Sequence, residues 1–284
     1  MYKDRYKHLI VTEQNHVLTC KLSNPPRHTL SIGVLNDING LLDKLETDNE
    51  TRVVVFTGAA DGIFLRWFEL TEIEQIGKQT QDIKMCGPGD TPKLTVIQEL
   101  GNRIEKLPQV TIAAINGFAA GGACGLTLCF DFRLMMTGDD RYMFGAPQTT
   151  FGITTCGGQS VRYVRMLGTA KTLDLLLHGT LLSPEEALKI GLVSRVFPKE
   201  TYYDEVDKFA QNLANRAPLA LRGIKKLIHA APDLTFMQGM CHEMIEYAKV
   251  VNTQDAKIAL AAVNAIENPD PRKFGEFKID FIGA

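Results

Sequence analysis

The sequence lacks the features of a membrane-spanning or secreted protein. None of its apolar runs approaches the roughly 18 residues that a membrane-spanning helix needs. The N-terminal stretch MYKDRYKHLIVTEQNHVLTCK carries charged side chains early and has no apolar core of the kind found in secretory signals. We therefore expect no membrane insertion and a cytoplasmic location.

The sequence also lacks paired cysteines and a strong excess of charge. Its six cysteines form no C-x-x-C motif, and most of them lie in apolar runs. Buried, reduced thiols are therefore expected in place of a disulfide framework or a zinc site. The formal net charge is −2, which argues against nucleic acid or an anionic membrane as the main partner.

What is present is an alternation of strand-like and helix-like segments. Residues 8–22 have the pattern of two short strands around a turn, 30–45 place apolar side chains at helical spacing, and 52–57 form an apolar strand. Strand, helix and strand in close succession are typical of an α/β fold. Further along, the pattern is mostly helical. We expect the α/β core to span 1–200 and a helical region to span 201–284.

One later segment carries a strong signal for a helix start. Ser183 has the character of an N-cap, Pro184 suits the first helical turn, and Glu186 completes a capping box. The sequence therefore predicts that a helix begins at Pro184.

One stretch, from Leu107 to Leu134, joins a buried strand to a run of small residues. The strand is expected over Val110–Ile115, and a buried helix is expected over Leu126–Phe132. The adjacent glycines Gly121 and Gly122 lie between them, where the absence of a Cβ lets a ligand approach the backbone. The N–H groups at a helix start have no partner inside the helix and favour negative charge. The same glycines are equally consistent with tight packing of a helix against a sheet.

Four blocks of the sequence, in order, resemble the crotonase (enoyl-CoA hydratase/isomerase) superfamily. They are NPPRHTL, VVVFTGAADGIFLRWFEL, AAINGFAAGGACGLTLCFDFRL and LGTAKTLDLLLHGTLLSPEEALKIGLVSRVFP. The resemblance covers about Val11 to Pro198. It implies a spiral of ββα turns that builds two roughly perpendicular sheets, followed by helices that drive assembly into a homotrimer or a dimer of trimers.

The resemblance also implies that the protein processes an acyl-CoA thioester. Members of the family polarise the thioester carbonyl with two backbone N–H groups, which meet the charge of an enolate as an oxyanion hole. In this sequence those donors fall on Phe68 and Gly122. No separate cofactor or metal is expected, because coenzyme A arrives as part of the substrate. The expected partners are the small-molecule acyl-CoA and other copies of the chain.

Two of the matching blocks supply the residues expected at the coenzyme A site. Arg27 and His28 lie where the family contacts coenzyme A, although an exposed surface pair would give the same pattern. The remaining expected contacts are Leu30, Arg66, Trp67 and Leu70. The side chains of Trp67 and Phe68 also fit an ordinary core or pocket wall.

Two departures from the family pattern bear on the chemistry. Hydratases of the family carry a glutamate a few residues after the glycine pair, where this sequence has Gly125. They carry a second glutamate after a proline, where this sequence has Gln148 after Pro147. Hydration needs one carboxylate to deprotonate water and a second group to deliver a proton to carbon. Neither residue here titrates, so we predict that ordinary hydration is slow.

Three side chains remain as candidates for a chemical role. Gln148 could hydrogen-bond a substrate carbonyl or a water molecule. Cys156 lies where the chlorobenzoyl-CoA dehalogenase branch, which shares the glycine, carries a nucleophilic aspartate. It could attack a thioester, although a buried inert cysteine is the more common role. Glu69 follows the first donor, where a structural or ligand-entrance role is favoured over that of a base.

Two classes of function follow from these residues. The first is an acyl-CoA-processing enzyme, a lyase or isomerase that stabilises a thioester enolate with non-standard acid and base residues. Its reaction could also be a decarboxylation or the hydrolysis of a thioester or a C–C bond. The second class is a non-catalytic acyl-CoA-binding homologue that kept the oxyanion hole and lost both carboxylates.

Overall fold

Two β-sheets form the centre of the molecule. The computed structural model describes residues 6–79, 94–266, 270 and 279–283. The six-stranded sheet contains, in spatial order, β1 (Leu9–Gln14), β2 (Val17–Leu22), β3 (Val53–Gly58), β5 (Val110–Ile115), β7 (Phe132–Thr137) and β10 (Arg195–Pro198). The four-stranded sheet contains β4 (Gly62–Leu65), β6 (Gly117–Ala120), β8 (Phe144–Gly145) and β9 (Leu181–Leu182).

From β3 to β8, consecutive strands alternate between the two sheets. β3, β5 and β7 pair in parallel within the larger sheet, and each is followed by a strand of the smaller sheet, namely β4, β6 or β8. Only the β1–β2 hairpin and the β8–β9 pair are antiparallel among the described strands. Each turn of the chain therefore adds one strand to each sheet before a helix follows. This arrangement confirms the expected α/β class and the ββα spiral.

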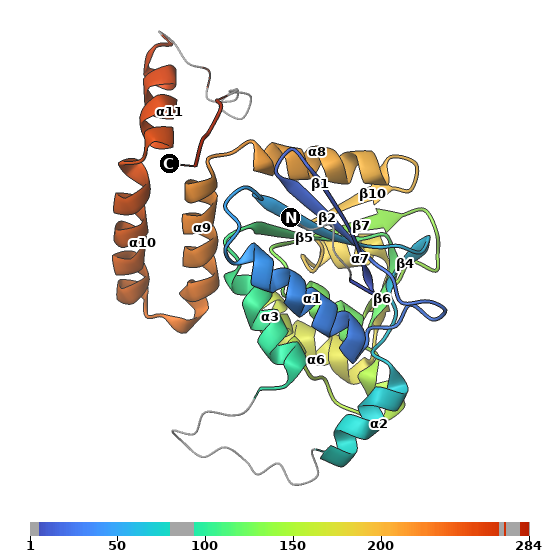
Figure 1. Cartoon of the computed structure of the whole chain (residues 1–284). Helices are drawn as coiled ribbons and strands as arrows, with labels where there is room; N and C mark the ends of the chain where they lie inside the picture. Colours follow the sequence, from blue (N-terminus) through green and yellow to red (C-terminus); the bar gives the residue numbers. More distant parts are fainter. Residues whose placement is uncertain (1–5, 80–93, 267–269, 271–278, 284) are drawn as a thin grey trace.

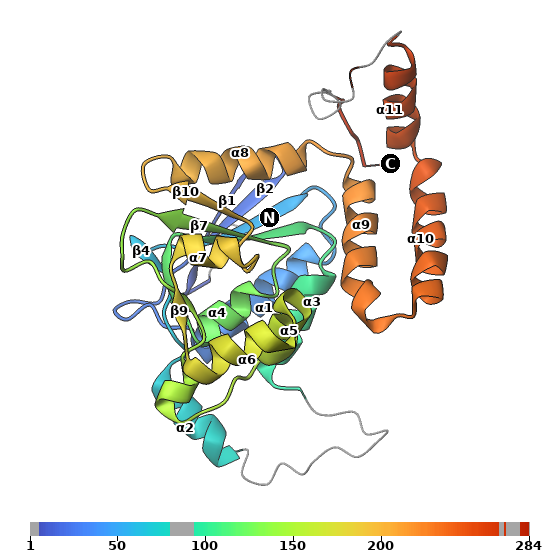
Figure 2. The same cartoon turned by 180° about the vertical axis from the view of Figure 1, so that it is seen from behind.

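Helices cover both faces of the larger sheet (Figures 1 and 2). On one side lie α1 (Ile32–Leu45), α3 (Val96–Lys106), α4 (Gly122–Thr127), α5 (Gln159–Leu167) and α6 (Thr169–His178). On the other side α8 (Tyr202–Ala214) packs across the strands. The remaining elements of the core are α2 (Leu70–Gln79), α7 (Pro184–Lys189) and the 3-10 helix η1 (Gln148–Phe151).

The predicted helix over Leu126–Phe132 is wrong. α4 begins earlier, at Gly122, and ends at Thr127. The guanidinium of Arg133 donates to the carbonyls of Thr127 and Phe130, at 3.4 and 2.6 Å. The carbonyl of Thr127 also accepts from the N–H of Phe130 at 3.2 Å, so a tight turn and a side chain from β7 together end the helix and lead the chain into the next strand.

The C-terminal helices extend away from the two sheets (Figure 1). They are α9 (Pro218–Ala230), the 3-10 turn η2 (Ala231–Asp233), α10 (Phe236–Val251) and α11 (Gln254–Asn264). α9 and α10 lie side by side, and an ion pair of 2.6 Å joins Lys226 to Glu246. Within the described residues, no helix is both long and apolar enough to cross a membrane. The boundary between an α/β core over 1–200 and a helical region over 201–284 stays a prediction.

Candidate active site

The N–H group of Phe68 is turned away from the segment that pairs with it. A parallel bridge joins Leu30 to Phe68. In it, the N–H of Leu30 donates to the carbonyl of Trp67 at 3.0 Å, and the N–H of Glu69 donates to the carbonyl of Leu30 at 2.7 Å. Neighbouring residues of an extended segment direct their backbone groups to opposite sides. The N–H of Phe68 therefore points away from Leu30, and it has no acceptor among the described residues.

Gly122 supplies a second unused donor at the start of α4. The N–H of Gly121 donates to the carbonyl of Gly145 at 2.9 Å, and the carbonyl of Gly121 accepts from the N–H of Gly125 at 3.0 Å. The N–H of Gly122 is a first-turn donor without a partner inside its helix. No residue in the described part of the chain accepts from it. Gly121 has φ 59° and ψ −122°, which glycine alone adopts easily and which turns the strand into the helix.

The two unused donors come from backbone segments in contact. A Cβ added to Gly122 would lie 3.1 Å from the Cβ of Phe68, and one added to Gly121 would lie 3.6 Å from the Cβ of Trp67. A side chain at Gly122 would therefore press on Phe68. The ring of Trp67 also packs edge-on against Phe118, with the centroids 6.4 Å apart. The fold thus brings together the two residues that the sequence singled out as a pair of backbone donors.

Gln148 is joined to the glycine pair through a second amide, Gln159. The Nε2 of Gln148 donates to the Oε1 of Gln159 at 2.6 Å, and the Nε2 of Gln159 donates to the carbonyl of Gly121 at 3.2 Å. Gln159 begins α5 and is almost completely buried. A Cβ added to Gly125 would lie 3.4 Å from the Cδ of Gln159. The space beside Gly125 is therefore filled by an amide, which does not titrate.

Glu69 is held by neighbouring side chains. Its Oε2 accepts from the hydroxyl of Thr29 at 2.9 Å, and its Oε1 lies 3.5 Å from both the guanidinium of Arg27 and the hydroxyl of Thr71. The side chain of Glu69 is 20% exposed. These contacts tie the segment after Phe68 to the loop before α1. They favour the structural role that the sequence suggested for Glu69.

The residues expected to contact coenzyme A differ in exposure. Leu30 is fully buried, whereas Leu70 is exposed at the start of α2. The N–H of Arg66 donates to the carbonyl of His28 at 2.8 Å, which places these two residues side by side. The Nδ1 of His28 and the Nε of Arg66 are buried and have no partner among the described residues. The guanidinium of Arg66 lies 5.7 Å from the ring centroid of Trp67.

The cysteines near the site lie in different environments. Cys156 is exposed in the loop before α5, so it is not the buried cysteine that a purely structural role would suggest. Its carbonyl accepts from the N–H of Gln159 at 3.4 Å. Cys124 lies inside α4, where burial raises the pKa of its thiol to about 12. The Cys124 thiol therefore stays protonated at neutral pH and cannot act as a nucleophile.

A buried charged cluster, which the sequence did not reveal, joins α9 to the larger sheet. The Oδ2 of Asp131 lies 2.8 Å from the Nζ of Lys225 and accepts from the N–H of Thr111 at 2.8 Å. The Oδ1 of Asp131 lies 2.8 Å from the Nε2 of His229. Asp131, Lys225 and His229 line a cavity of about 600 Å³, whose lining contains none of the site residues expected from the sequence. This cavity therefore lies apart from the two backbone donors.

Comparison with known proteins identifies the family whose sequences and fold this chain shares. A sequence profile described as enoyl-CoA hydratase/isomerase matches residues 12–270, which extends beyond the four blocks into the C-terminal helices. The 2,3-dehydroadipyl-CoA hydratase of Escherichia coli K12 is 27% identical over 263 residues, or 92% of this chain and 97% of that protein. The mitochondrial enoyl-CoA delta isomerase 1 of Mus musculus is 32% identical over 189 residues, or 66% of this chain and 62% of that protein. The crystal structure of an enoyl-CoA hydratase from Bacillus anthracis is 26% identical, with a TM-score of 0.83 over 98% of this chain and 100% of that one.

Proposed function

Because the chain belongs to the enoyl-CoA hydratase/isomerase family, we propose that it processes an acyl-CoA thioester whose carbonyl oxygen is bound by the N–H groups of Phe68 and Gly122. The observation that carries this proposal is the contact between two backbone segments whose N–H groups lack acceptors among the described residues. Breaking a bond to the carbon next to a thioester moves negative charge onto the carbonyl oxygen, forming an enolate. Preorganised donors at that oxygen usually supply the largest single catalytic effect.

The proposed reaction is of the lyase or isomerase type, with non-standard acid and base groups. The two amides next to the glycine pair, Gln148 and Gln159, neither take up nor release a proton at neutral pH. The rate would then come mainly from stabilising the enolate. Glu69 and Cys156 are the titratable side chains proposed to assist. The contacts of Glu69 restrain it, whereas the exposure of Cys156 leaves its thiol accessible.

Coenzyme A is proposed to arrive as part of the substrate, with no separate cofactor. Arg27, with a side chain 70% exposed, offers a positive charge to its phosphates. The half-buried side chains of His28, Arg66 and Trp67 offer contacts to its polar and aromatic parts. Leu30 and Leu70 would supply apolar surface. We place this activity in the cytoplasm, because free buried cysteines fit a reducing compartment.

A spectrophotometric assay with crotonyl-CoA, run beside calorimetric binding of butyryl-CoA, tests the proposal. We expect butyryl-CoA to bind and the hydration of crotonyl-CoA to be far slower than an ordinary turnover of roughly 1 to 1,000 per second. Hydration at an ordinary rate would show that another carboxylate, with Glu69 as the first candidate, has replaced the missing pair. Absence of binding would contradict the acyl-CoA assignment itself.

A second function, acyl-CoA binding without turnover, is favoured by one observation. The side chain of Gln159 occupies the space beside Gly125, and Gln148 completes an amide pair where a hydratase needs two carboxylates. A panel of enoyl, β-keto and malonyl thioesters separates the two functions. Turnover of any of them that is lost on changing a side chain of the site identifies an enzyme. Binding without turnover across the panel identifies a binding protein.

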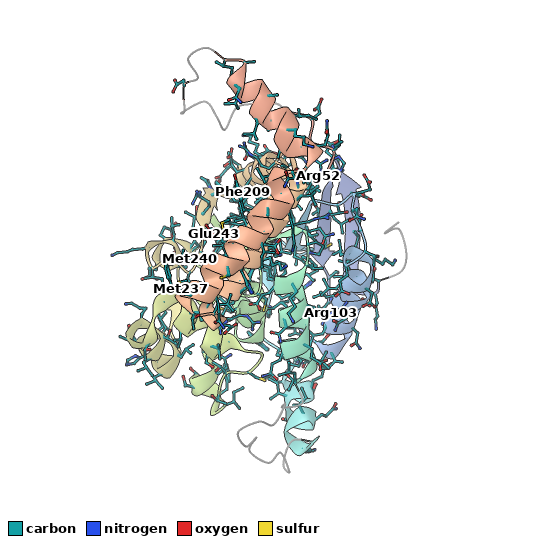
Figure 3. The ribbon with its side chains drawn as sticks, turned by 90° about the vertical axis from the view of Figure 1, so that its left-hand side faces the viewer. Arg52, Arg103, Phe209, Met237, Met240 and Glu243 are labelled. Carbon is teal, nitrogen blue, oxygen red and sulfur yellow. The ribbon has the colours of Figure 1, made fainter. Side chains whose placement is uncertain are left out.

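We also propose that copies of the chain assemble through the C-terminal helices, as a homotrimer or a dimer of trimers. α10 has no buried residue in the single chain. Phe236 is 82% exposed, and Met237, Met240 and Met244 are also exposed. Figure 3 looks onto α10 from outside, with Met237 and Met240 labelled along it. Soluble monomers rarely expose large contiguous apolar patches, so a partner surface is the proposed cover.

A further inference from the structure

The cavity of about 600 Å³ between α5 and α9 has an apolar rim that is exposed in the single chain. α5 contributes Val161 and Met166 to its lining, and α9 contributes Ile224 and Ile228. All four side chains are exposed, and Ile228 is 67% exposed. Single exposed apolar residues are common in proteins, but several around one hollow form a patch of the kind that binds another surface.

The α10 helix of the same chain lies on the opposite side of α9 from this rim. Lys226 of α9 pairs with Glu246 of α10 at 2.6 Å, and the two helices lie side by side (Figures 1 and 2). Lys226 is two residues from both Ile224 and Ile228, which is roughly half a turn of an α-helix. α9 therefore turns one face to α10 and the opposite face to the cavity, so α10 does not cover the rim of its own chain.

α10 carries an apolar ridge that no other part of its own helix pair covers. Phe236, Met240, Met244 and Tyr247, which we call the α10 ridge, are spaced by three or four residues and therefore lie along one side of the helix. All four are exposed, and α10 has no buried residue in the single chain. Unbranched methionine side chains adapt to irregular apolar gaps, which suits a ridge that enters a cavity.

The charges of the two surfaces are complementary. The cavity lining contains more cations than carboxylates, namely Arg133, Arg162, Arg165 and Lys225 against Glu105 and Asp131. The most exposed of these cations is Arg165, and its ion pair with Asp233 is itself exposed and therefore weak. Glu243 lies beside the α10 ridge and is exposed (Figure 3). A ridge flanked by a carboxylate is therefore attracted to a cavity with an excess of positive charge.

We propose that the cavity between α5 and α9 receives the α10 ridge of a second copy of the chain. This inference rests on the assembly proposed above and adds the surface that receives α10. The ridge and the cavity are different surfaces, so each copy gives its ridge to one neighbour and receives the ridge of another. Such a head-to-tail contact can close into a ring, and a ring of three is the proposed homotrimer. Packing of α10 against α10 would instead be two-fold symmetric and would give a dimer.

Cross-linking through a native cysteine tests which surfaces meet. Cys241 is exposed on α10, next to Met240. Cys86→Ser and Cys156→Ser together leave Cys241 as the one exposed cysteine among the described residues. Into this full-length background we add Val161→Cys at the cavity, or Gln75→Cys on α2 as a matched exposed control, and treat each protein with a short bismaleimide. We expect gel bands of two and three linked chains with Val161→Cys only, and their loss when Cys241→Ser is added.

The other outcomes of the cross-linking overturn the inference in distinguishable ways. Linked dimers in the background itself would join Cys241 to Cys241 and show that α10 packs against α10. Ile228→Cys, on the α9 side of the cavity, repeats the test from a second position. A multimer by light scattering that gives no added bands at either position, or equal bands with Gln75→Cys, would contradict the cavity assignment and leave the proposed assembly intact. A monomeric wild type would remove both proposals.

A charge on the cavity rim gives a second measurement. Ile224 is 59% exposed in the single chain, so Ile224→Glu should leave the fold of each copy intact while placing a carboxylate in the proposed apolar contact. The mass by light scattering should fall to that of one chain, whereas Gln75→Glu should keep the wild-type mass. An Ile224→Glu protein that keeps the wild-type mass would contradict the inference.

Discussion

Gly117 begins β6 at the point where the chain passes from the larger sheet to the smaller one. Its φ is 148°, and a Cβ added to it would lie 2.1 Å from the carbonyl oxygen of Gly62. The contact is with backbone, so it cannot be relieved by rotating a side chain. Gly77 in α2 is the opposite case, because a Cβ there would meet nothing within 4 Å.

We therefore expect Gly117→Ala to lower the free energy of unfolding by about 2–4 kcal/mol. The matched substitution Gly77→Ala should raise it by about 0.5–1 kcal/mol, because alanine is the better helix former. Denaturant unfolding of both variants measures the difference. Similar changes in the free energy of unfolding of the two variants would show that the passage from β5 to β6 at Gly117 tolerates a side chain.

Single residues also show what the sequence could and could not predict. Phe68 and Gly122 could be named from the sequence because their proposed role depends on backbone, which the family pattern preserves. Gln148 was found as a candidate, but the direction of its amide was not, since that depends on Gln159 and on Gly121, 38 residues before Gln159. No local spacing marks Gln159. The side chain of Asn116 is buried and bonds both backbone groups of Gly58, which lies 58 residues earlier in the chain.

At the scale of elements, local signals succeeded where the partners are close in sequence. α7 begins at Pro184 with the predicted capping box of Ser183 and Glu186. The helix expected over Leu126–Phe132 is replaced by a turn and a strand. One of the groups at the end of α4 is the guanidinium of Arg133, which also donates to the carbonyl of Leu192 at 2.8 Å. Arg133 and Leu192 are 59 residues apart, so a local sequence pattern could not predict this contact.

The junction of α9 with the sheet offers two adjacent lysines in different environments. Lys225 is buried with Asp131, whereas Lys226 is 65% exposed and pairs with Glu246. Lys225→Met removes one partner of a buried pair and should cost about 3–5 kcal/mol of unfolding free energy. Lys226→Met removes an exposed ion pair and should cost less than about 1 kcal/mol. Denaturant unfolding compares them, and equal losses would contradict this account of α9.

Asp131 should make the stability of the same junction sensitive to acid. Burial alone would raise its pKa, but the hydrogen bond from His229 and the charge of Lys225 lower the pKa of Asp131 below its ordinary value of 3.8. Such a carboxylate stabilises the fold above the unfolded-state pKa and loses this contribution as the pH falls through the folded-state pKa. Asp131→Asn should therefore be less stable than the wild type at neutral pH, and the difference should shrink below pH 3.8. A constant difference down to about pH 3 would argue against this linkage.

At the scale of the whole molecule, the end of the chain ties the C-terminal helices back to the core. The guanidinium of Arg52 donates to the carbonyls of Ala214 and Phe281, at 3.0 and 2.6 Å. The carboxylate of Asp255 in α11 accepts from the N–H groups of Ile282 and Gly283. The ββα spiral was predictable from the sequence. The position of α9, α10 and α11 away from the sheets could not be predicted, because it depends on contacts between segments that are distant in the sequence.

The proposed assembly predicts how charge on α10 changes the mass in solution. We expect the wild type to be a trimer or a multiple of it by light scattering after size-exclusion chromatography. The double variant Met240→Glu and Met244→Glu should shift the protein to monomer, because each change puts a charge into an apolar interface. Gln75→Glu, which adds the same charge on α2, should keep the wild-type mass. A monomeric wild type would rule out the proposed assembly.

The most direct measurement of the central claim compares two substitutions at Gly122. Alanine adds a Cβ and keeps the N–H, whereas proline adds a Cβ, removes the N–H and suits the first position of a helix. Calorimetry with butyryl-CoA and with S-butyl-CoA, which lacks the carbonyl, isolates the contribution of the thioester oxygen. We predict that the wild type binds butyryl-CoA about tenfold more tightly than S-butyl-CoA, and that Gly122→Pro shows almost no preference. Gly122→Ala adds the same pressure on Phe68 but keeps the N–H, so it should retain a clear part of the preference. A full preference in Gly122→Pro, or none in the wild type, would contradict the claim that this backbone donor binds the thioester.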